Sequence, residues 1–483
     1  MSLARRASLN IMLKALGEFS RLAWALLLIL VARRLGAESL GRIAFAFSFT
    51  TIIVLLTDLG MNVLVVREVA RDRGAAGCYL GNLLSLKLVS APVAFGLIAA
   101  AISLSGYSSD VVTVVLLFAG ISIARGLLEL YGAVFSGLEV MGREAVLKNL
   151  YQMGLFLSGG IALALGYGAL GLSVALLIAS LLTVLVGSGM VRRTMPGVRL
   201  LWDGALWLSM MRRALPLAMT TIFIILYNDS DLVLLSYLGK EEHEVGLYAA
   251  ASKILKTLQL IPMLIVSGVY PVFSDLARGS KDALNTAYRG TLKLLLMIAI
   301  PLSIVVAIFA DLFIRLIYGQ GFTQAIPPLR LLALSIPFVY LGYVLVNVLV
   351  SSDHLAWAAL ATGGACTINV AANLLLIPVL GISGSAMAAT ATQVALVVIG
   401  GVATGRAVTR SRWIQLASKP IVAGAAMLLI VMLVGRASWM FAFPAGLGAY
   451  LLALALTGSL REEEFAAVKR LWRGVALQKV RHP

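Results

Sequence analysis

Charged residues are scarce in this chain. Asp, Glu, Lys and Arg make up 13% of the 483 residues, against roughly 25% in ordinary soluble domains, whereas 60% of the residues are hydrophobic. The mean hydropathy is +0.97. This shortage of charge excludes a soluble globular protein and indicates a chain that crosses a membrane many times.

Cysteine and histidine are also rare. The two cysteines, Cys78 and Cys366, fall at the end of one predicted span and inside another, so we expect no structural disulfide. The three histidines lie in loops or in the tail, and no pair of them has the spacing of metal ligands. We therefore expect no metal site, no other cofactor and no catalytic residues.

Long apolar runs are abundant. Each is close to the roughly 20 residues that a spanning helix needs and exceeds the roughly 10 alternating residues of an outer-membrane barrel strand. The runs predict an all-α integral membrane protein with about 14 transmembrane helices. The predicted spans are 10–32, 42–64, 81–104, 110–132, 146–165, 169–190, 214–237, 247–270, 290–310, 328–351, 355–378, 382–404, 419–436 and 438–459.

The basic residues favour one set of loops. With the N-terminus inside, most of the 39 Lys and Arg residues lie on the cytoplasmic side, with Arg33, Arg34 and Arg42 as exceptions. We expect a multi-pass protein of the cytoplasmic membrane with both termini in the cytoplasm. The net charge of +17 indicates attraction to anionic lipid headgroups, and no soluble basic domain suggests binding to nucleic acid.

Two patterns of glycine and small residues occur twice. Residues 35–41 match 238–246, and residues 168–175 match 381–388. The matches predict duplicated halves of six spans, although small residues also recur by chance in membrane helices that pack closely. Because six is even, the two lobes are parallel, and transporters of this construction bind substrate between them.

The duplication predicts the domain organisation. Apolar and basic residues of the linker and the tail suggest helices lying in the membrane interface, with solvated connectors as the alternative. We expect an N-terminal lobe at 1–190 holding spans 1–6, a cytoplasmic interfacial linker at 191–213, a C-terminal lobe at 214–405 holding spans 7–12, spans 13–14 at 406–459 and a basic cytoplasmic tail at 460–483.

Six basic residues interrupt the apolar runs. A charge at membrane depth costs roughly 2.5 to 3.5 kcal/mol on insertion scales, so such residues usually face a protein interior or a watery cavity. They predict a cationic cavity, although one close to a span end, Lys87, could instead extend to the headgroups. The six are Lys14, Arg21, Lys87, Arg125, Lys253 and Lys256.

Helical spacing groups several of these charges. Lys14, Glu18 and Arg21 share one helix face, and Lys253 and Lys256 share another. Such faces can bind an anion through charge-assisted hydrogen bonds, or they can hold helices together as internal ion pairs. We predict that all five line the substrate site.

Three acidic residues at depth are candidates for ion coupling, because a carboxylate there is costly unless it is paired or protonated. They are Asp58, Glu129 and Asp231. Arg125 is a further substrate-binding candidate, and an internal ion pair with Glu129 is the alternative. The coupling ion, Na⁺ or H⁺, is left open.

Several loop motifs resemble the polysaccharide-exporter branch of the multidrug/oligosaccharidyl-lipid/polysaccharide (MOP) transporter superfamily, which includes O-antigen and lipid II flippases and has a MATE-like fold of two six-helix lobes and two C-terminal helices. Each motif is loose by itself, but the order and spacing cover nearly the whole chain. The motifs are Val31-Ala32-Arg33-Arg34-Leu35-Gly36 through Gly41, Asp58-Leu59-Gly60, Arg67-Glu68-Val69-Ala70, Asp231-Leu232-Val233-Leu234, Val245-Gly246-Leu247-Tyr248-Ala249-Ala250 and Leu316-Ile317-Tyr318-Gly319.

The resemblance implies a flippase or exporter for polyprenyl-pyrophosphate-linked oligosaccharides that works by rocking of two lobes about a central cavity. In lipid II flippases the first and eighth helices border that cavity, and Lys14, Arg21, Lys253 and Lys256 match those helices in position. The expected partners are the lipid-linked oligosaccharide and polysaccharide biosynthesis enzymes, with a functional monomer that is not an enzyme. A cation-coupled multidrug antiporter is the main alternative; a membrane glycosyltransferase or polymerase, or a scaffold, is less favoured.

Overall fold

Helices account for every regular element of the computed structural model, which describes residues 21–58, 60–239, 241–408, 413–434 and 439–458. The predicted all-α membrane fold is confirmed. The elements are α2 (Arg21–Asp58), α3 (Met61–Arg71), η1 (Arg73–Ala75), α4 (Ala76–Ser103), α5 (Ser109–Gly137), α6 (Met141–Ala164), α7 (Ala169–Thr194), α8 (Gly204–Tyr237), α9 (Glu242–Leu258), α10 (Leu260–Gly279), α11 (Lys281–Ile308), α12 (Ala310–Ile317), η2 (Gln320–Ala325), α13 (Ile326–Ala333), α14 (Ile336–Ser351), α15 (Leu355–Ala407), α16 (Trp413–Val434) and α17 (Trp439–Leu456).

The helices follow the predicted spans. Within the described residues nine helices are long and apolar enough to cross a membrane, or ten if the bent pair Gln320–Ala333 and Ile336–Ser351 forms one span. Every predicted span overlaps a helix, and α2 and α15 each overlap two. The 53 residues of α15 would extend about 80 Å, far more than the roughly 30 Å hydrocarbon core, so α15 contains two spans.

Glycines divide these two long elements. Gly36 in α2 has φ 82°, and Gly381 in α15 has φ 57°. Both values lie in the left-handed region, which glycine enters without the steric cost that a Cβ brings. The sequence places loops at the same two points.

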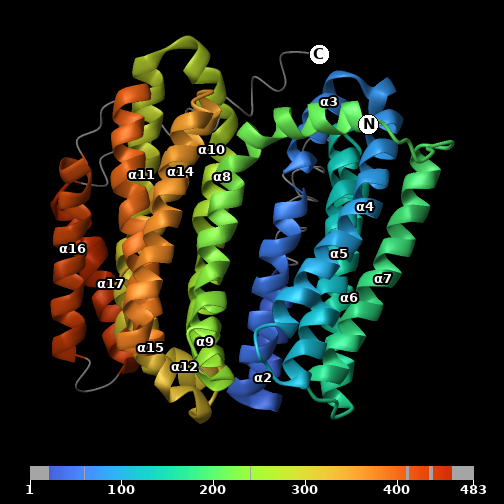
Figure 1. The fold of residues 1–483 in the computed structure, drawn as a ribbon. Coiled ribbons are helices and arrows are strands. Elements are labelled where there is room, and N and C mark those ends of the chain that lie inside the picture. The colour runs from blue at the N-terminus through green and yellow to red at the C-terminus, as the bar shows by residue number, and fades with distance from the viewer. Residues whose placement is uncertain (1–20, 59, 240, 409–412, 435–438, 459–483) are drawn as a thin grey trace. The chain divides into compact units, whose positions relative to one another are not determined.

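One compact unit, unit 1, consists of the described residues of Met1–Ala250 together with Ile317–Phe322. Within it α5 packs against α2, α3, α4, α6 and α7, and Phe118 and Phe135 of α5 are fully buried. Figure 1 shows α4, α5, α6 and α7 running side by side. The apolar core of unit 1 therefore centres on α5.

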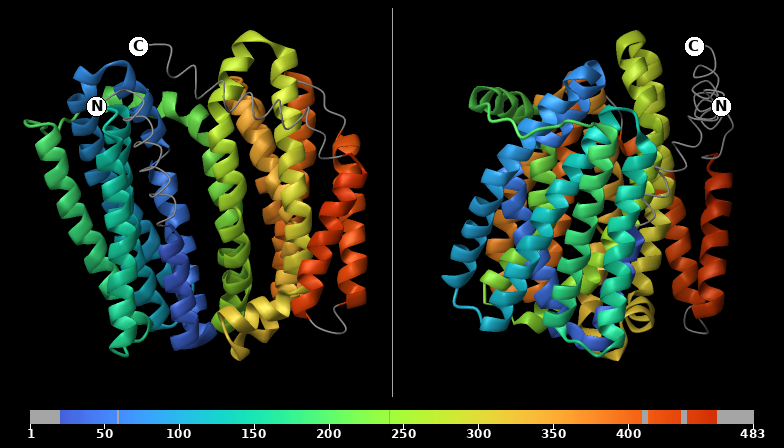
Figure 2. Two further views of the ribbon diagram at one scale, coloured as in Figure 1. Left: turned by 180° about the vertical axis from the view of Figure 1, so that it is seen from behind. Right: turned by 90° about the vertical axis from the view of Figure 1, so that its right-hand side faces the viewer.

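The other compact unit, unit 2, consists of Ala251–Leu316 and the described residues of Thr323–Pro483. Here α14 packs against α10, α11 and α15, and the Tyr340 hydroxyl donates to the Leu258 carbonyl oxygen at 3.0 Å. The paired helices α16 and α17, red in Figure 2, pack on α11. The Tyr450 hydroxyl of α17 donates to the Met297 carbonyl oxygen of α11 at 2.9 Å and ties the C-terminal pair to unit 2.

The helix α8 is grouped differently by the sequence repeat and by the packing of the compact units. The predicted duplication assigns α8 to the second half of the chain, yet α8 packs against α2, α3 and α4 in unit 1. The predicted boundaries after residues 190, 213 and 405 concern sequence repeats rather than compact units, and they stay predictions.

Candidate functional site

Arg125 of α5 is a basic residue at membrane depth whose surroundings are defined. Its guanidinium carbon lies 5.2 Å from the centroid of the Phe47 ring of α2, a cation–π geometry. One of its nitrogens donates to the Thr51 hydroxyl at 3.1 Å, and its side chain is 25% exposed. The ring of Trp24 lies 5.5 Å from that of Phe47. An arginine here is oriented by aromatic and hydroxyl groups and is still partly accessible.

The ion pair that we considered as an alternative role for Arg125 is present. Its Nε lies 3.8 Å from a carboxylate oxygen of Glu129, one turn along α5, and the Glu129 side chain is 56% exposed. A pair of this length between partly exposed groups contributes at most about 1 kcal/mol. Since a guanidinium has five N–H donors, more than Thr51 and Glu129 use, Arg125 can also bind an oxyanion.

Four predicted site residues fall wholly or partly outside the part of the chain that the structure describes. Lys14 and Glu18 lie outside the described residues, as do the side chains of Arg21, the first residue of α2, and Asp58, its last. Their roles in substrate binding and ion coupling stay predictions.

Lys253 and Lys256 lie on α9, one helical turn apart, and both are partly buried. Neither is without a partner. They belong to unit 2, whereas Arg125 belongs to unit 1. The predicted cationic cluster of these lysines with Arg21 therefore stays a prediction.

Asp231 is the most enclosed of the acidic candidates. The residue is 6% exposed, and its carboxylate accepts a 2.7 Å hydrogen bond from the hydroxyl of Tyr248, which is 1% exposed. Nearby in α8, Asp229 accepts a 3.5 Å hydrogen bond from the Ser48 hydroxyl of α2. A buried carboxylate held by a phenol can bind a proton or a small cation.

Lys87 borders a small hollow in unit 1. The residue is 9% exposed, and the cavity beside it has a volume of about 80 Å³. Val54, Leu88, Ala94 and Leu127 supply much of its lining. The hollow is therefore mostly apolar, with one buried basic side chain at its wall.

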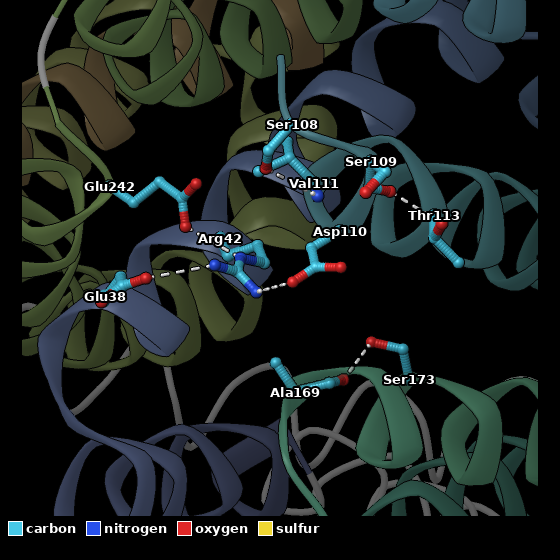
Figure 3. A network of polar contacts seen from close by, with 10 residues as sticks. All are labelled: Glu38, Arg42, Ser108, Ser109, Asp110, Val111, Thr113, Ala169, Ser173 and Glu242. Carbon is cyan, nitrogen blue, oxygen red and sulfur yellow. Dashed lines mark hydrogen bonds and ion pairs between the residues drawn. The ribbon is translucent and has the colours of Figure 1, made fainter.

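The sequence did not lead us to predict a network of ion pairs around Arg42 of α2. Its guanidinium lies 2.8 Å from Glu242 of α9, 3.2 Å from Glu38 of α2 and 3.8 Å from Asp110 of α5, measured between nitrogen and oxygen atoms. Figure 3 shows the three carboxylates around the guanidinium. The sequence analysis noted Arg42 only as a basic residue on the predicted outer side. The signal that could have revealed the network is acidic residues predicted for that same side, two in loops and Asp110 at the start of a span.

Comparison with family models identifies two matches. The Polysacc_synt model, "Polysaccharide biosynthesis protein", matches residues 10–277, and the MatE model matches residues 216–375. The search of curated proteins found no match. Within the described residues, no group of three or more His, Cys, Asp or Glu side chains could hold a metal ion.

Solved structures share the fold. The lipid II flippase MurJ in an inward closed conformation aligns with TM-score 0.73 at 14% identity, covering 93% of this chain and 99% of the other. An inward-facing multidrug-resistance MATE transporter aligns with TM-score 0.65 at 18% identity, covering 84% and 98%. A MOP superfamily transporter from Pyrococcus furiosus aligns with TM-score 0.59 at 17% identity, covering 84% and 95%. With the polysaccharide biosynthesis model matching more than half of its length, the chain belongs to that family.

Proposed function

We propose that this protein is a flippase that moves a polyprenyl-pyrophosphate-linked oligosaccharide across the cytoplasmic membrane. Two lobes alternate access to a central cationic cavity, so the protein acts as a transporter rather than as an enzyme. The family description, polysaccharide biosynthesis, and the MurJ-like fold support this class of function.

The observation that carries the proposal is Arg125. A pyrophosphate that leaves water needs charge-assisted donors, and an arginine offers them in a planar fork. The guanidinium of Arg125 is held by Phe47 and Thr51, lies within a spanning helix and is a quarter exposed. Lys14, Glu18, Arg21, Lys253 and Lys256 complete the proposed site, on the helices that border the cavity in lipid II flippases.

A cation-coupled multidrug antiporter is the second candidate, and Asp231 is the observation that favours it. A buried carboxylate bonded to Tyr248 suits a transported proton or sodium ion, and the MatE model covers this half of the chain. In the flippase, Asp231, Glu129 and Asp58 are the proposed coupling residues. Uptake of organic cations with no flipping of lipid-linked sugar would establish the antiporter.

The membrane setting extends the proposal. Both termini face the cytoplasm, and the segment before α8 lies along anionic headgroups. Trp202 in that segment is 62% exposed and Leu208, near the start of α8, is 51% exposed, both close in sequence to basic residues including Arg199. The protein works as a monomer alongside polysaccharide biosynthesis enzymes that supply its substrate.

The test is flipping of a lipid-linked sugar in reconstituted vesicles. We expect Arg21→Ala, and the double change Lys253→Ala with Lys256→Ala, to lose activity while inserting at normal levels. Each charge-assisted contact is worth about 1.5 to 3 kcal/mol, so losing one weakens binding roughly 10- to 150-fold. The control is Arg193→Ala, at the exposed end of α7. Flipping at the unmodified rate by the charge-removing variants would refute the cationic cavity.

A further inference from the structure

Two glycines from the repeated motif touch each other through their backbones. A methyl group on Gly41 of α2 would overlap the carbonyl oxygen of Glu242 and lie 2.7 Å from the nitrogen of Gly246. A methyl group on Gly246 of α9 would overlap the carbonyl oxygen of Ala37 and lie 2.9 Å from the nitrogen of Gly41. The two helices thus approach more closely than any side chain would allow.

The contact is reciprocal in the sequence. Gly41 and Gly246 are the last glycines of the two copies of the motif. In the structure each glycine meets the carbonyl oxygen four residues before the other. The turn glycines that precede the contact, Gly36 and Gly239, share φ 82°. This is the pattern of a local two-fold axis between the duplicated halves.

Charged groups surround the glycine contact. Arg42 follows Gly41 and binds Glu242 of the other motif at 2.8 Å, with Glu38 and Asp110 beside it (Figure 3). Glu242 also lies in the first turn of α9, where the helix dipole favours a negative charge. The ion pairs hold the two motifs in register.

An aromatic cluster includes Tyr237, the last residue of α8, which directly precedes the second copy of the motif. The Tyr237 ring lies 6.1 Å from Phe45, 6.0 Å from Phe49 and 5.9 Å from Tyr107. The Tyr107 hydroxyl bonds Ser236 at 2.7 Å, and burial raises the pKa of Tyr107, so the hydroxyl stays protonated. Aromatic rings from both halves of the chain therefore pack next to the glycines and ion pairs.

From these contacts we infer that residues 37–49, 236–239 and 241–250 form a separable seal, which closes one end of the translocation route and opens during each cycle. The inference rests on the proposed function, whose topology places the seal on the outer side. At the two glycines the helices meet backbone to backbone, without interlocked side chains. The Arg42–Glu242 ion pair beside them is partly exposed, so water can solvate both charges when such a contact breaks. In alternating access, one end must be closed while the other is open.

The first test measures the seal directly. Nitroxides at Arg34→Cys and His243→Cys, both exposed positions, report the distance between the motifs in a Cys78→Ser, Cys366→Ala background. Pulsed electron paramagnetic resonance in lipid nanodiscs then gives the distance distribution. Gly41→Leu should add or enrich a longer-distance population, because the new side chain cannot fit beside Glu242.

Two further variants serve as controls for Gly41→Leu. Gly41→Ala makes the same overlap with a smaller side chain and covers the case in which Gly41→Leu fails to fold. Gly160→Leu on α6, where a Cβ would meet nothing within 4 Å, should leave the distribution unchanged. If Gly41→Leu and Gly41→Ala both keep the unmodified distribution, the seal is refuted.

The second test locks the seal. A bifunctional maleimide that joins Arg42→Cys to Glu242→Cys should reduce flipping to the rate of protein-free vesicles. The matched cross-link joins Arg73→Cys to Glu139→Cys, another ion pair, and should leave flipping unchanged. Normal flipping with the 42–242 cross-link would overturn the inference alone. Distances that shift as expected in a protein that flips no lipid-linked sugar would instead overturn the proposed function and keep the seal.

Discussion

The aromatic ring beneath Arg125 makes this residue more than a point charge. Phe47 contacts the face of the guanidinium and Thr51 takes one of its donors, which fixes the plane of the fork. A lysine would keep the charge but lose the planar fork and its paired donors.

We therefore predict graded effects at residue 125. Arg125→Lys should keep part of the flipping activity, and Arg125→Ala should lose roughly 10-fold or more, since a charge-assisted bond is worth about 1.5 to 3 kcal/mol. The measurement is the initial flipping rate in vesicles, normalised to inserted protein. Equal rates for the Ala variant and the unmodified protein would assign Arg125 to the ion pair with Glu129.

The buried Asp231 leads to a prediction about coupling. Asp231→Asn keeps an acceptor for the Tyr248 hydroxyl but removes the charge, so the protein should fold and lose its dependence on pH or Na⁺. Transport measured across a range of pH and of Na⁺ concentration tests this. Tyr248→Phe is the control for the hydrogen bond alone. An unchanged ion dependence in Asp231→Asn would remove Asp231 from the coupling candidates.

Two of the three basic residues that the topology prediction places outside, Arg33 and Arg42, have local partners. Arg42 lies among three carboxylates, and the Nε of Arg33 donates to the carbonyl oxygen of Ile317 at 2.7 Å. Both side chains therefore have a structural role in the packing of unit 1.

At the scale of elements, α15 depends on close contact between its two halves. Buried Asn369 donates to the hydroxyl of Thr392 at 3.0 Å across the kink at Gly381. A methyl group on Gly384 would overlap the carbonyl oxygen of Leu376. The glycine that the repeat analysis singled out thus permits the two halves to pack.

Gly384→Ala should lower stability by about 1 to 3 kcal/mol, the usual result of overpacking. The matched control is Gly405→Ala in the same helix, where a Cβ would meet nothing within 4 Å. Thermal unfolding in detergent, followed by size-exclusion chromatography, compares the two. A midpoint for Gly384→Ala equal to that of Gly405→Ala would show that α15 relaxes around the extra methyl.

Hydropathy predicted the elements because spanning helices are set by local composition and length. The sequence also placed breaks at Gly36 and Gly381, since glycine motifs separate apolar runs there. It could not place Phe47 over Arg125 or Asp110 beside Arg42, because those contacts join residues distant in the chain and depend on how helices rotate about their axes. The candidate site is therefore predicted as a set of charges, and its geometry comes from packing.

At the scale of the whole molecule, topology is directly testable. Reporter fusions at residues 75, 140, 280 and 408 should read cytoplasmic, and fusions at 107, 242 and 380 should read external, as the distribution of Lys and Arg requires. Alkaline phosphatase and green fluorescent protein fusions give opposite signals and check each other. A reversed signal at 280 alone would mean an odd number of spans before that point and would break the model of two six-span lobes.

The reciprocal contact of Gly41 and Gly246 also bears on how such a chain could arise. A surface that meets an equivalent copy of itself is an isologous interface, the kind that builds two-fold dimers. A half-length ancestor carrying one copy of the motif would already possess both sides of this contact. Joining two such genes end to end would preserve the interface without a new one having to evolve, and afterwards each glycine would restrict which residues the other copy could accept.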